Sequence, residues 1–320
     1  MTTRLTVRTT MWRSHVASIA ASVDGLVPVV KGNGYGFGRA ALAAIAAEIS
    51  DTIAVGTIHE LEGLPEGIGD RVDVAVLTPT LTAPESSPIA GAATILTVGN
   101  QAHIDALVGR ADTGGEGNRV VVKLASSMQR FGGGLHLVEQ ARQAGLDVVG
   151  VGLHPPLAGT SADHRLEIEA LLPDVDPALP VWLSHLDVRD YAQLPTTHTY
   201  RLRLGTALWH GDKSFLHLSA DVLDVRPVDA GDRAGYHQEA VTASGHLVMI
   251  GAGTAHGVAE LADGRSPFHF RRRRLALHEP PHMHVSMGFV PNGDPVPAIG
   301  DRVDLQRPLI TTAVDAYEWR

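Results

Sequence analysis

Short apolar runs alternate with helical stretches over the first two thirds of the chain. A run of four to eight apolar residues is typical of a buried strand, and apolar positions recurring every three or four residues are typical of an amphipathic helix. Eight runs predict strands, at Val27–Lys31, Ile53–Ile58, Val72–Leu77, Thr94–Val98, Val120–Leu124, Val148–Leu153, Pro180–Ser184 and Tyr200–Leu204. Helical patterns lie between several of them, at Arg39–Ile49, Gln101–Val108, Leu135–Ala144 and Ala162–Leu171.

This alternation indicates a parallel sheet that is covered by helices. Eight strands within about 200 residues favour an α/β fold of the (β/α)8 TIM-barrel type, which we assign to residues 1–214. A doubly wound open sheet is the alternative, because periodicity does not distinguish the two. In both folds the chemistry is expected at the carboxyl ends of the strands.

The pattern changes after Gly211. Apolar stretches are now interrupted by Gly, Asp and Pro turns, and none of them shows a long helical period. They lie at Leu216–Arg226, His237–Ile250, Pro267–Leu277 and Met283–Phe289. We therefore expect a mainly β C-terminal domain over residues 215–320. At the other end of the chain, the Ala-rich residues 14–23 predict a first amphipathic helix.

Composition restricts the class of protein. The chain has 320 residues, of which 44% are hydrophobic and 19% charged, as is typical of a packed globular protein. A net charge of -9 argues against a nucleic-acid or anionic-membrane partner, and no apolar run reaches membrane-spanning length. The absence of cysteine excludes disulfides and thiolate chemistry. We expect a cytoplasmic protein.

A single lysine ends the first predicted strand. Residues 27–38 contain four apolar positions, then Lys31, then a glycine-rich turn. Burial lowers the pKa of an ammonium group, so a lysine at this position is suited to form a Schiff base or to act as a general base. A surface lysine before a tight turn is the alternative.

The whole stretch resembles the lysine motif of the alanine racemase family, V-V-K-A-N-A-Y-G-H-G. The matching residues are Lys31, Asn33, Tyr35, Gly36 and Gly38, and the differing ones are Gly32, Gly34 and Phe37. The resemblance implies that the cofactor is pyridoxal 5′-phosphate. It also implies that Lys31 binds this cofactor covalently and that Tyr35 helps to hold its phosphate.

Two further matches follow the fifth and sixth predicted strands. Residues 128–130 resemble part of the family's T-G-M-G-R-x-G, although Ser126, Ser127 and Gln129 differ. The resemblance implies that Arg130 lies near the cofactor's phenolic oxygen and the substrate carboxylate, which a guanidinium can bind through two hydrogen bonds. His154 resembles the histidine that packs against the pyridine ring and orients the catalytic tyrosine. Taken alone, these residues favour a surface arginine and a structural histidine, and the functional roles rest on the resemblance.

The last two predicted strands end in a candidate phosphate site. Ser184 ends the seventh strand, and residues 203–211 resemble the family's R-x-G-x-x-L-Y-G. Loops after these strands often bind phosphate in such barrels, so we expect the Ser184 hydroxyl and the N–H groups of Gly205 and Thr206 to do so. Arg203 matches the arginine that faces the pyridine nitrogen. Its permanent charge prevents it from accepting the ring proton, which leaves a weaker electron sink that suits simple proton transfer.

The second base is expected from the C-terminal domain. Residues 234–236 and 250–257 resemble the family block V-S-Y-G…I-G-Y-A-D-G, so Tyr236 matches the catalytic tyrosine. The resemblance implies a head-to-tail homodimer in which Lys31 serves one face of the substrate Cα and the partner's tyrosine the other. His154 and Arg203 would assist ionisation of Tyr236, because a tyrosine pKa is ordinarily about 10. Taken alone, a tyrosine in a turn is usually structural.

The matches weaken toward the C-terminus. Met287, within V-S-M against the family's V-C-M-D, is expected to present its backbone N–H to the substrate. Ala252 replaces a tyrosine that restricts substrate access, and no counterpart of the family's closing phosphate-binding tyrosine is recognised before Arg320. Both losses predict a wider entrance that admits amino acids larger than alanine. The resemblance further implies that Leu5–Val7 pairs with the C-terminal domain.

Two clusters have simpler explanations than a binding site. We expect Arg271–Arg274 to form a solvated hairpin or loop rather than an anion site. His278, His282 and His284 have only Glu279 as an acidic neighbour, so we expect no metal site.

The sequence thus predicts a pyridoxal-phosphate-dependent racemase of alanine or another small amino acid. A fold-related decarboxylase uses a cysteine that this chain lacks. The remaining alternative is a catalytically weakened relative that binds pyridoxal phosphate or a protein partner.

Overall fold

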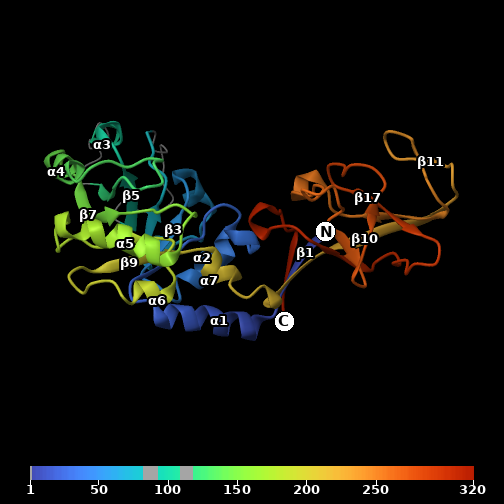
Figure 1. Cartoon of the computed structure of the whole chain (residues 1–320), viewed down its shortest axis with the longest axis horizontal. Helices are drawn as coiled ribbons and strands as arrows, with labels where there is room; N and C mark the ends of the chain where they lie inside the picture. The colour runs from blue at the N-terminus through green and yellow to red at the C-terminus, as the bar shows by residue number, and fades with distance from the viewer. Residues whose placement is uncertain (1, 82–92, 109–117) are drawn as a thin grey trace. The chain divides into compact units, whose positions relative to one another are not determined.

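The computed structural model describes residues 2–81, 93–108 and 118–320, and the chain divides into two compact units (Figure 1). Ser14–Tyr35 and Arg39–Gly211 form the barrel unit. Met1–Arg13, Gly36–Gly38 and Asp212–Arg320 form the β unit. The division after Gly211 lies close to the expected boundary at residue 214. Unlike the expected domain 1–214, however, the barrel unit lacks the first residues of the chain and three residues of the lysine motif.

The barrel unit contains an eight-stranded parallel sheet within the described residues, in the order β2-β9-β8-β7-β6-β5-β4-β3. The strands are β2 (Leu26–Pro28), β3 (Thr52–Val55), β4 (Asp73–Val76), β5 (Thr94–Val98), β6 (Arg119–Lys123), β7 (Asp147–Gly152), β8 (Val181–Leu183) and β9 (Tyr200–Leu204). Each overlaps one predicted strand. A bridge between Val29 and Ala54, next to a hydrogen bond from the Val30 N–H to the Ala54 carbonyl, joins the β2 and β3 segments. The sheet is therefore closed, and the open-sheet alternative is wrong.

Helices alternate with these strands, as βα units require. They are α1 (Thr9–Ser22), α2 (Arg39–Ala46), α3 (Gln101–Val108), α4 (His136–Gln143), α5 (Ser161–Leu171), α6 (Val188–Tyr191) and α7 (Thr206–His210). Short 3-10 helices lie at η1 (Gly34–Gly36), η2 (Ile58–Gly63), η3 (Ile68–Asp70) and η5 (Leu172–Asp174). All four helices predicted between strands are present. The start of α5 shows the local cause, because Thr160 and Asp163 form a capping box there.

Burial on both faces of the sheet explains why the barrel strands are continuous apolar runs in the sequence. Every residue of β2, β3 and β8 is buried, as in a parallel sheet with both faces covered. Large side chains such as Ile53 and Leu183 are fully buried, and each contributes roughly 1.5–3 kcal/mol to stability. A core of this kind holds the strand ends in fixed positions.

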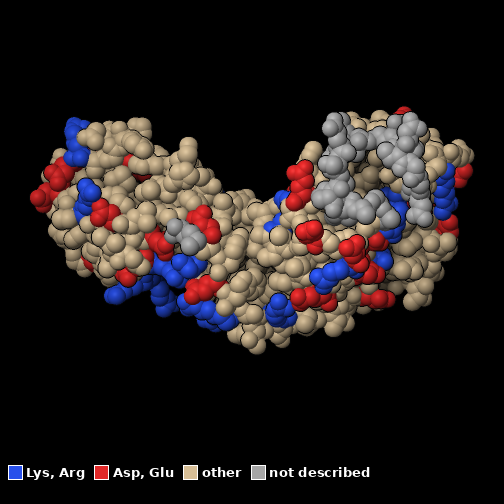
Figure 2. Space-filling model, turned by 180° about the vertical axis from the view of Figure 1, so that it is seen from behind, with Lys and Arg blue, Asp and Glu red and all other residues tan. Residues whose placement is uncertain are grey.

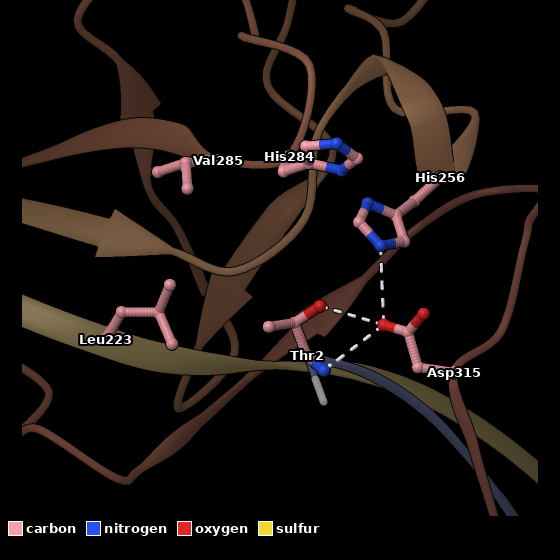
Figure 3. Close-up of a pocket in the computed structure, with 6 residues that line it drawn as sticks. All are labelled: Thr2, Leu223, His256, His284, Val285 and Asp315. Atoms are coloured by element: carbon pink, nitrogen blue, oxygen red, sulfur yellow. Dashed lines mark hydrogen bonds and ion pairs between the residues drawn. The ribbon is translucent and has the colours of Figure 1, made fainter.

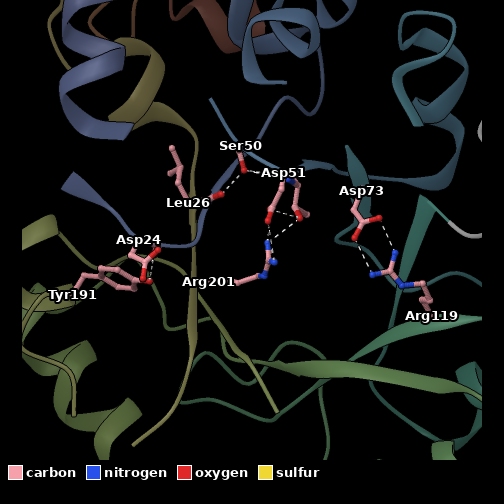
Figure 4. Close-up of polar contacts among 9 residues, drawn as sticks. Asp24, Leu26, Ser50, Asp51, Asp73, Arg119, Tyr191 and Arg201 are labelled. Atoms are coloured by element: carbon pink, nitrogen blue, oxygen red, sulfur yellow. Dashed lines mark hydrogen bonds and ion pairs between the residues drawn. The ribbon is translucent and has the colours of Figure 1, made fainter. Parts of the chain in front are cut away.

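Ion pairs lie at the amino ends of the barrel strands (Figure 4). Arg119, which begins β6, pairs with Asp73, which begins β4, at 2.7 Å. Arg201 of β9 pairs with Asp51, the residue before β3, at 2.8 Å. In barrels of this type the amino end serves stability and the carboxyl end carries the chemistry. The candidate site is therefore sought at the opposite end.

The β unit contains a nine-stranded sheet within the described residues, with the path β15-β14-β18-β10-β13-β17-β16; β1 pairs with β10 and β19. Its strands are β1 (Thr3–Val7), β10 (Leu216–Val228), β13 (Gly245–Ile250), β14 (Phe268–Phe270), β15 (Arg273–Arg274), β16 (Ala276–Leu277), β17 (Ser286–Pro291), β18 (Arg302–Leu305) and β19 (Ala316–Trp319). A separate hairpin consists of β11 (Arg233–Ala234) and β12 (Glu239–Ala240), and 3-10 helices lie at η6 (Lys213–Phe215), η7 (Thr254–His256) and η8 (Leu309–Thr311). The pairing of β1 with β10 confirms that Leu5–Val7 joins this unit.

Two of the expected strands of the β unit are divided by turns. Residues 237–244 form a turn and β12 rather than the beginning of β13. Residues 267–277 form β14, β15 and β16, and β14 and β15 pair as a hairpin around Arg271 and Arg272. The prediction of a hairpin for the arginine run is therefore confirmed. Apolar content alone did not show where the chain reverses.

Phe37 belongs to the β unit and packs on two of its tryptophans. Its ring centroid lies 5.1 Å from that of Trp12 and 6.1 Å from that of Trp319, and the side chain is fully buried. Aromatic pairs at these separations add to the energy of burial. The departure from the family motif at Phe37 thus supplies packing.

Two features of the molecule concern its distribution of surface charge and the apolar character of its helices. On the face shown in Figure 2, acidic and basic side chains are interspersed among uncharged surface. Among the helices of the described residues, none has both the length and the apolar character needed to cross a membrane.

Candidate active site

Candidate residues from five strands meet at the carboxyl end of the barrel. Lys31 follows β2, Lys123 ends β6, His154 follows β7, Ser184 follows β8, and Arg203 lies near the end of β9. In a closed parallel barrel these ends surround a single mouth. The structure therefore brings together side chains that are far apart in the sequence.

Lys31 is an exposed residue at this mouth, and its surroundings favour the neutral form of its amine. Partial burial, followed by the charges of Arg130 and Arg203, lowers the pKa of Lys31, while the charge of Glu60 acts in the opposite direction. The lowered pKa increases the fraction of neutral amine at neutral pH. Only the neutral amine can act as a nucleophile or accept a proton.

Glu60 is absent from the sequence-based candidates, although it holds the turn after Lys31. Its carboxylate accepts the N–H of Gly32 at 3.1 Å and that of Gly56 at 2.7 Å. Arg39 donates from Nε and Nη2 to the Gly32 carbonyl, at 3.2 and 2.7 Å. Both polar backbone groups of Gly32 are thus bound by charged side chains. Because Gly32 and Glu60 are 28 residues apart, no short motif could have indicated this contact.

Lys123 was also not predicted as a site residue. It is 5% exposed, and burial together with the charges of Arg203 and Arg130 lowers its pKa to about 7. Its ammonium group lies 5.2 Å from the centroid of the Phe131 ring. The available signal was the single lysine inside the predicted strand Val120–Leu124, since a buried charge is rare.

Arg203 is held by backbone carbonyls of two neighbouring strands. Its Nε donates to the Leu183 carbonyl at 3.1 Å, and its Nη2 donates to the Leu153 carbonyl at 2.7 Å. Burial and the charge of Arg130 lower the pKa of Arg203 to about 10, so the guanidinium remains charged at neutral pH. One side chain therefore links the ends of β7, β8 and β9.

His154 and Ser184 form a pair. The Ser184 hydroxyl and His154 Nδ1 share a hydrogen bond of 2.6 Å, and the Ser184 residue is buried. Burial, with the charges of Arg203 and Lys123 among the further causes, lowers the pKa of His154 to about 2. The imidazole is consequently neutral at physiological pH. Ser184, which the resemblance assigns to the phosphate, is thus hydrogen-bonded to His154, which it assigns to the pyridine ring.

Tyr35 packs directly on the backbone of Gly205. A Cβ atom at Gly205 would lie 1.9 Å from the Tyr35 hydroxyl oxygen and 2.5 Å from its Cζ, so only glycine fits. The Tyr35 carbonyl accepts a hydrogen bond from His210 Nε2 at 2.7 Å. Burial and the charge of Glu60 raise the pKa of Tyr35 to about 12, which keeps the phenol neutral. The exposed Thr206 begins α7 immediately after Gly205, and this helix has no side-chain cap.

Arg130 lies in the loop after β6. It is exposed, and its guanidinium lies 4.4 Å from the centroid of the Phe131 ring. Its charge contributes to the lowered pKa values of Lys31 and Lys123. This electrostatic influence is consistent with a position beside the mouth.

Tyr236 and Met287 belong to the β unit. Tyr236 lies in the turn between β11 and β12, is 81% exposed, and has its ring centroid 4.1 Å from that of His282. Met287 is buried in β17 opposite Met249 of β13, and its carbonyl accepts the N–H of His278 at 2.8 Å.

Two positions bear on the family tyrosines that the sequence was expected to lack. Tyr317 of β19 lies beside the lysine motif, because a Cβ atom at Gly38 would be 3.3 Å from its hydroxyl oxygen. The closing segment therefore contains a tyrosine that packs on Gly38 of the β unit. Ala252 is fully buried in the core of the β unit, with Val258 and Phe268. The wider entrance stays a prediction.

A cavity of about 490 Å³ lies within the β unit (Figure 3). It is lined by Thr2, Leu223, His256, His284, Val285 and Asp315. The Asp315 carboxylate accepts the N–H and hydroxyl of Thr2, at 3.1 and 2.8 Å, and lies 3.3 Å from His256 Nε2. Because these polar groups already bind one another, they indicate a structural contact between the residue before β1 and the residue before β19. None of the predicted site residues lines this cavity.

The histidines near Glu279 do not form a metal-binding group. Within the part of the chain that the structure describes, no cluster of three or more His, Asp or Glu side chains could hold a metal ion. His282 Nε2 lies instead 2.5 Å from the Glu279 carboxylate.

Comparisons with known proteins agree on one family. The family model described as alanine racemase, N-terminal domain, matches residues 10–178. Alanine racemase from a D-cycloserine-producing Streptomyces lavendulae is 20% identical and superimposes with a TM-score of 0.75, over 100% of this chain and 97% of that chain. Alanine racemase from Bartonella henselae, with covalently bound pyridoxal phosphate, is 19% identical, with a TM-score of 0.72 over 97% and 91% of the two chains. Alanine racemase from Clostridium difficile 630 is 16% identical, with a TM-score of 0.75 over 99% and 96%.

A comparison with curated protein sequences finds no match. The structural matches establish a shared fold over nearly the whole chain, and the family model covers 10–178 of its 320 residues. The chain therefore belongs to the alanine racemase N-terminal domain family.

Proposed function

We propose that this protein is a pyridoxal-phosphate-dependent racemase that interconverts the L and D forms of alanine or another small amino acid. The observation that carries the proposal is the meeting of Lys31, Arg203, His154 and Tyr35 at one end of the barrel unit. The amine has a lowered pKa, the guanidinium is anchored, the imidazole is neutral, and the phenol lies against Gly205. Family membership and the shared fold support the same chemistry.

The residues present fit a phosphorylated aldehyde. The close approach of the Tyr35 phenol to Gly205 places a neutral hydroxyl donor at the start of α7. The backbone N–H groups of Gly205 and Thr206 lie at the same helix start, which has no side-chain cap. Phenolic and backbone donors around a glycine suit a phosphate group. Lys31 would bind the aldehyde, and Arg203 and His154 would contact the ring.

Proton transfer at the substrate Cα is the chemistry that these residues support. When bound, pyridoxal phosphate withdraws electrons from the Cα–H bond and makes the proton removable. Lys31 would accept or return that proton on one face, because its lowered pKa leaves part of the amine neutral. Arg203 would donate a hydrogen bond to the ring nitrogen and keep its own proton, so the ring would stay neutral. Arg130 would bind the substrate carboxylate through its planar guanidinium.

We assign the opposite face of Cα to Tyr236 from the partner subunit of a homodimer. The exposure of 81% of this tyrosine supports the assignment, because a large aromatic side chain on an outer turn is available to a second copy of the chain. Met287 would present its backbone N–H to the substrate. The two-base arrangement accounts for inversion, since the proton leaves one face and returns to the other.

The test begins with purified protein and added pyridoxal phosphate. We expect a visible absorption band that borohydride or Lys31→Ala abolishes, and formation of D-alanine from L-alanine and the reverse. Tyr236→Phe should lower racemisation in both directions by about 100-fold or more. A protein that retains the band but racemises neither alanine nor serine would instead be a cofactor-binding relative without this activity. Unchanged racemisation by Tyr236→Phe would contradict the two-base assignment.

A further inference from the structure

The turn that carries Tyr236 is built around a buried carboxylate. The Glu279 side chain is 0% exposed and accepts the backbone N–H of Tyr236 at 3.1 Å and that of His237 at 3.3 Å. Its Oε1 also lies 2.5 Å from His282 Nε2. Burial alone would raise the pKa of Glu279, but the N–H groups of His237 and Tyr236 and the His282 ring outweigh burial and lower it. The carboxylate therefore remains ionised and holds three donors.

Gly235 permits this approach. A Cβ atom there would lie 2.2 Å from Glu279 Oε1, and its φ of 80° also favours glycine. The other side of the turn is closed by Arg233, which donates to the Gln238 carbonyl at 2.8 Å. The backbone that carries Tyr236 is thus restrained from both sides.

The Tyr236 ring needs a separate restraint, because 81% of the residue is exposed. An exposed tyrosine samples several side-chain rotamers. Its only ring contact among the described residues is with His282, at a centroid distance of 4.1 Å and an interplanar angle of 35°. The imidazole itself is 18% exposed and is oriented by its bond to Glu279. A fixed flat surface therefore lies beside the phenol.

We propose that Glu279 and His282 are positioning residues for Tyr236: the buried carboxylate holds the Tyr236 turn and orients the imidazole, and the imidazole face directs the phenol. This inference rests on the proposed function, in which Tyr236 transfers the Cα proton. A misplaced proton-transfer group loses rate although the substrate still binds. The two residues thus affect turnover more than substrate affinity.

Substitutions at residue 282 separate the contribution of the flat ring of His282 from that of its N–H donor. His282→Phe keeps a flat ring and loses the N–H donor, whereas His282→Gln keeps a donor and loses the ring. We expect His282→Ala and His282→Gln to lower kcat about 10- to 100-fold with little change in KM, and His282→Phe to lower it less, because the flat ring is kept while the bond that orients it is lost. His284→Ala, in the same loop but without a contact to Tyr236, is the matched control and should equal wild type.

Isotope exchange distinguishes positioning from a general loss of structure. In D2O, the variants should slow exchange of the Cα hydrogen more for the enantiomer served by Tyr236 than for the one served by Lys31. Equal slowing for both enantiomers, or a His282→Ala rate equal to that of His284→Ala in an active protein, would overturn the proposal. A wild-type protein that racemises no amino acid would contradict the proposed function instead.

The restraint that Glu279 places on the Tyr236 turn can be tested without cofactor or substrate. In the cofactor-free full chain, Glu279→Gln removes the charge and one acceptor oxygen while keeping the size of the side chain. Peptides that contain residues 235–238 should then exchange their amide hydrogens about tenfold faster than in wild type, measured by mass spectrometry. The His284→Ala protein should exchange at the wild-type rate. Unchanged amide hydrogen exchange in Glu279→Gln would show that Glu279 does not restrain this turn, whatever the enzymatic result.

Discussion

At the scale of single residues, Arg203 influences the titration of Lys31, Lys123 and His154 in the barrel mouth. Its charge is among the causes that lower the pKa of Lys31, Lys123 and His154, and burial is the larger cause for each. Because a guanidinium stays charged at physiological pH, this influence is permanent. Two amines and one imidazole thereby lose protons more easily than they would in water.

Lys123→Met should change the dependence of stability on pH. The pKa of Lys123 is about 7 in the folded protein and 10.5 is the ordinary value, so between these pH values the unfolded chain binds more protons. The wild-type free energy of unfolding therefore rises with pH across this window, and the cost of burying the charged lysine is fully present below it. We expect the variant to be more stable near pH 7, by on the order of a few kcal/mol, and the difference to shrink toward pH 10. Urea unfolding at both pH values checks this, and parallel curves for the two proteins would contradict it.

Gly205→Ala should disturb both stability and cofactor binding. The added Cβ would lie 1.9 Å from the Tyr35 hydroxyl oxygen, which forces the phenol away from the start of α7. We expect a loss of about 1–3 kcal/mol in stability, as for other overpacked sites, and at least tenfold weaker pyridoxal phosphate binding. Thermal unfolding and a spectroscopic titration measure the two effects.

The control for this prediction is a double-mutant cycle. In a Tyr35→Ala background the new methyl group has room, so Gly205→Ala should lower stability much less there than in wild type. Equal losses in both backgrounds would mean that the contact with Tyr35 is not the cause.

At the scale of elements, the β14–β15 hairpin uses an unusual turn. Arg271 and Arg272 have φ values of 47° and 68°, the left-handed region that two-residue hairpin turns require and that Asn-Gly usually supplies. Arg273 pairs with Asp294, and the Arg271 guanidinium lies 5.3 Å from the Phe270 ring. The arginine run is therefore a turn with local contacts.

The double substitution Arg271→Asn and Arg272→Gly in this turn should stabilise the protein. A non-glycine residue in the left-handed region costs about 1–2 kcal/mol, and loss of the Arg271 contact with Phe270 offsets part of the gain by about 0.5–1 kcal/mol. We expect a higher melting temperature and unchanged racemisation. Each single substitution should give part of the effect, and a lower melting temperature for the pair would show that the arginines make contacts worth more than the strain.

At the scale of the whole molecule, the proposed dimer makes a quantitative prediction. If each active site combines Lys31 of one subunit with the tyrosine of the other, Lys31→Ala and Tyr236→Phe homodimers are both inactive. A mixed dimer has one site with both native residues and one with neither. Equimolar mixing with subunit exchange should then restore about a quarter of wild-type activity, because about half of the dimers are mixed.

Activity after mixing is the measurement, and each variant alone is the control. A mixture that stays inactive although mass spectrometry detects mixed dimers would place both bases in one subunit. Sedimentation of the wild type tests the assembly independently, and a monomer with full activity would contradict the shared site.

Much of the barrel could be predicted because its strands are buried over their length. Burial on both faces demands continuous apolar residues, so β2 to β9 are visible as runs between helical patterns. Lys31, His154 and Arg203 were found because they match family motifs that are local in sequence, and each match falls at a predicted strand end, where a barrel carries its chemistry. In the β unit, by contrast, the apolar pattern over Pro267–Leu277 did not show the turn at Arg271, and the run of arginines was the signal that indicated it.

The sequence by itself determined the alternation of strands and helices, the position of Lys31 at a strand end and the family motif around it, because these depend on neighbours along the chain. Only the tertiary structure decided that the sheet closes through Val29 and Ala54, that Glu60 holds the turn after Lys31, and that Ala252 is buried. The physical reason is that closure, burial and pKa depend on groups distant in sequence. Their contacts exist only when the chain is folded, so no local pattern of residue types encodes them.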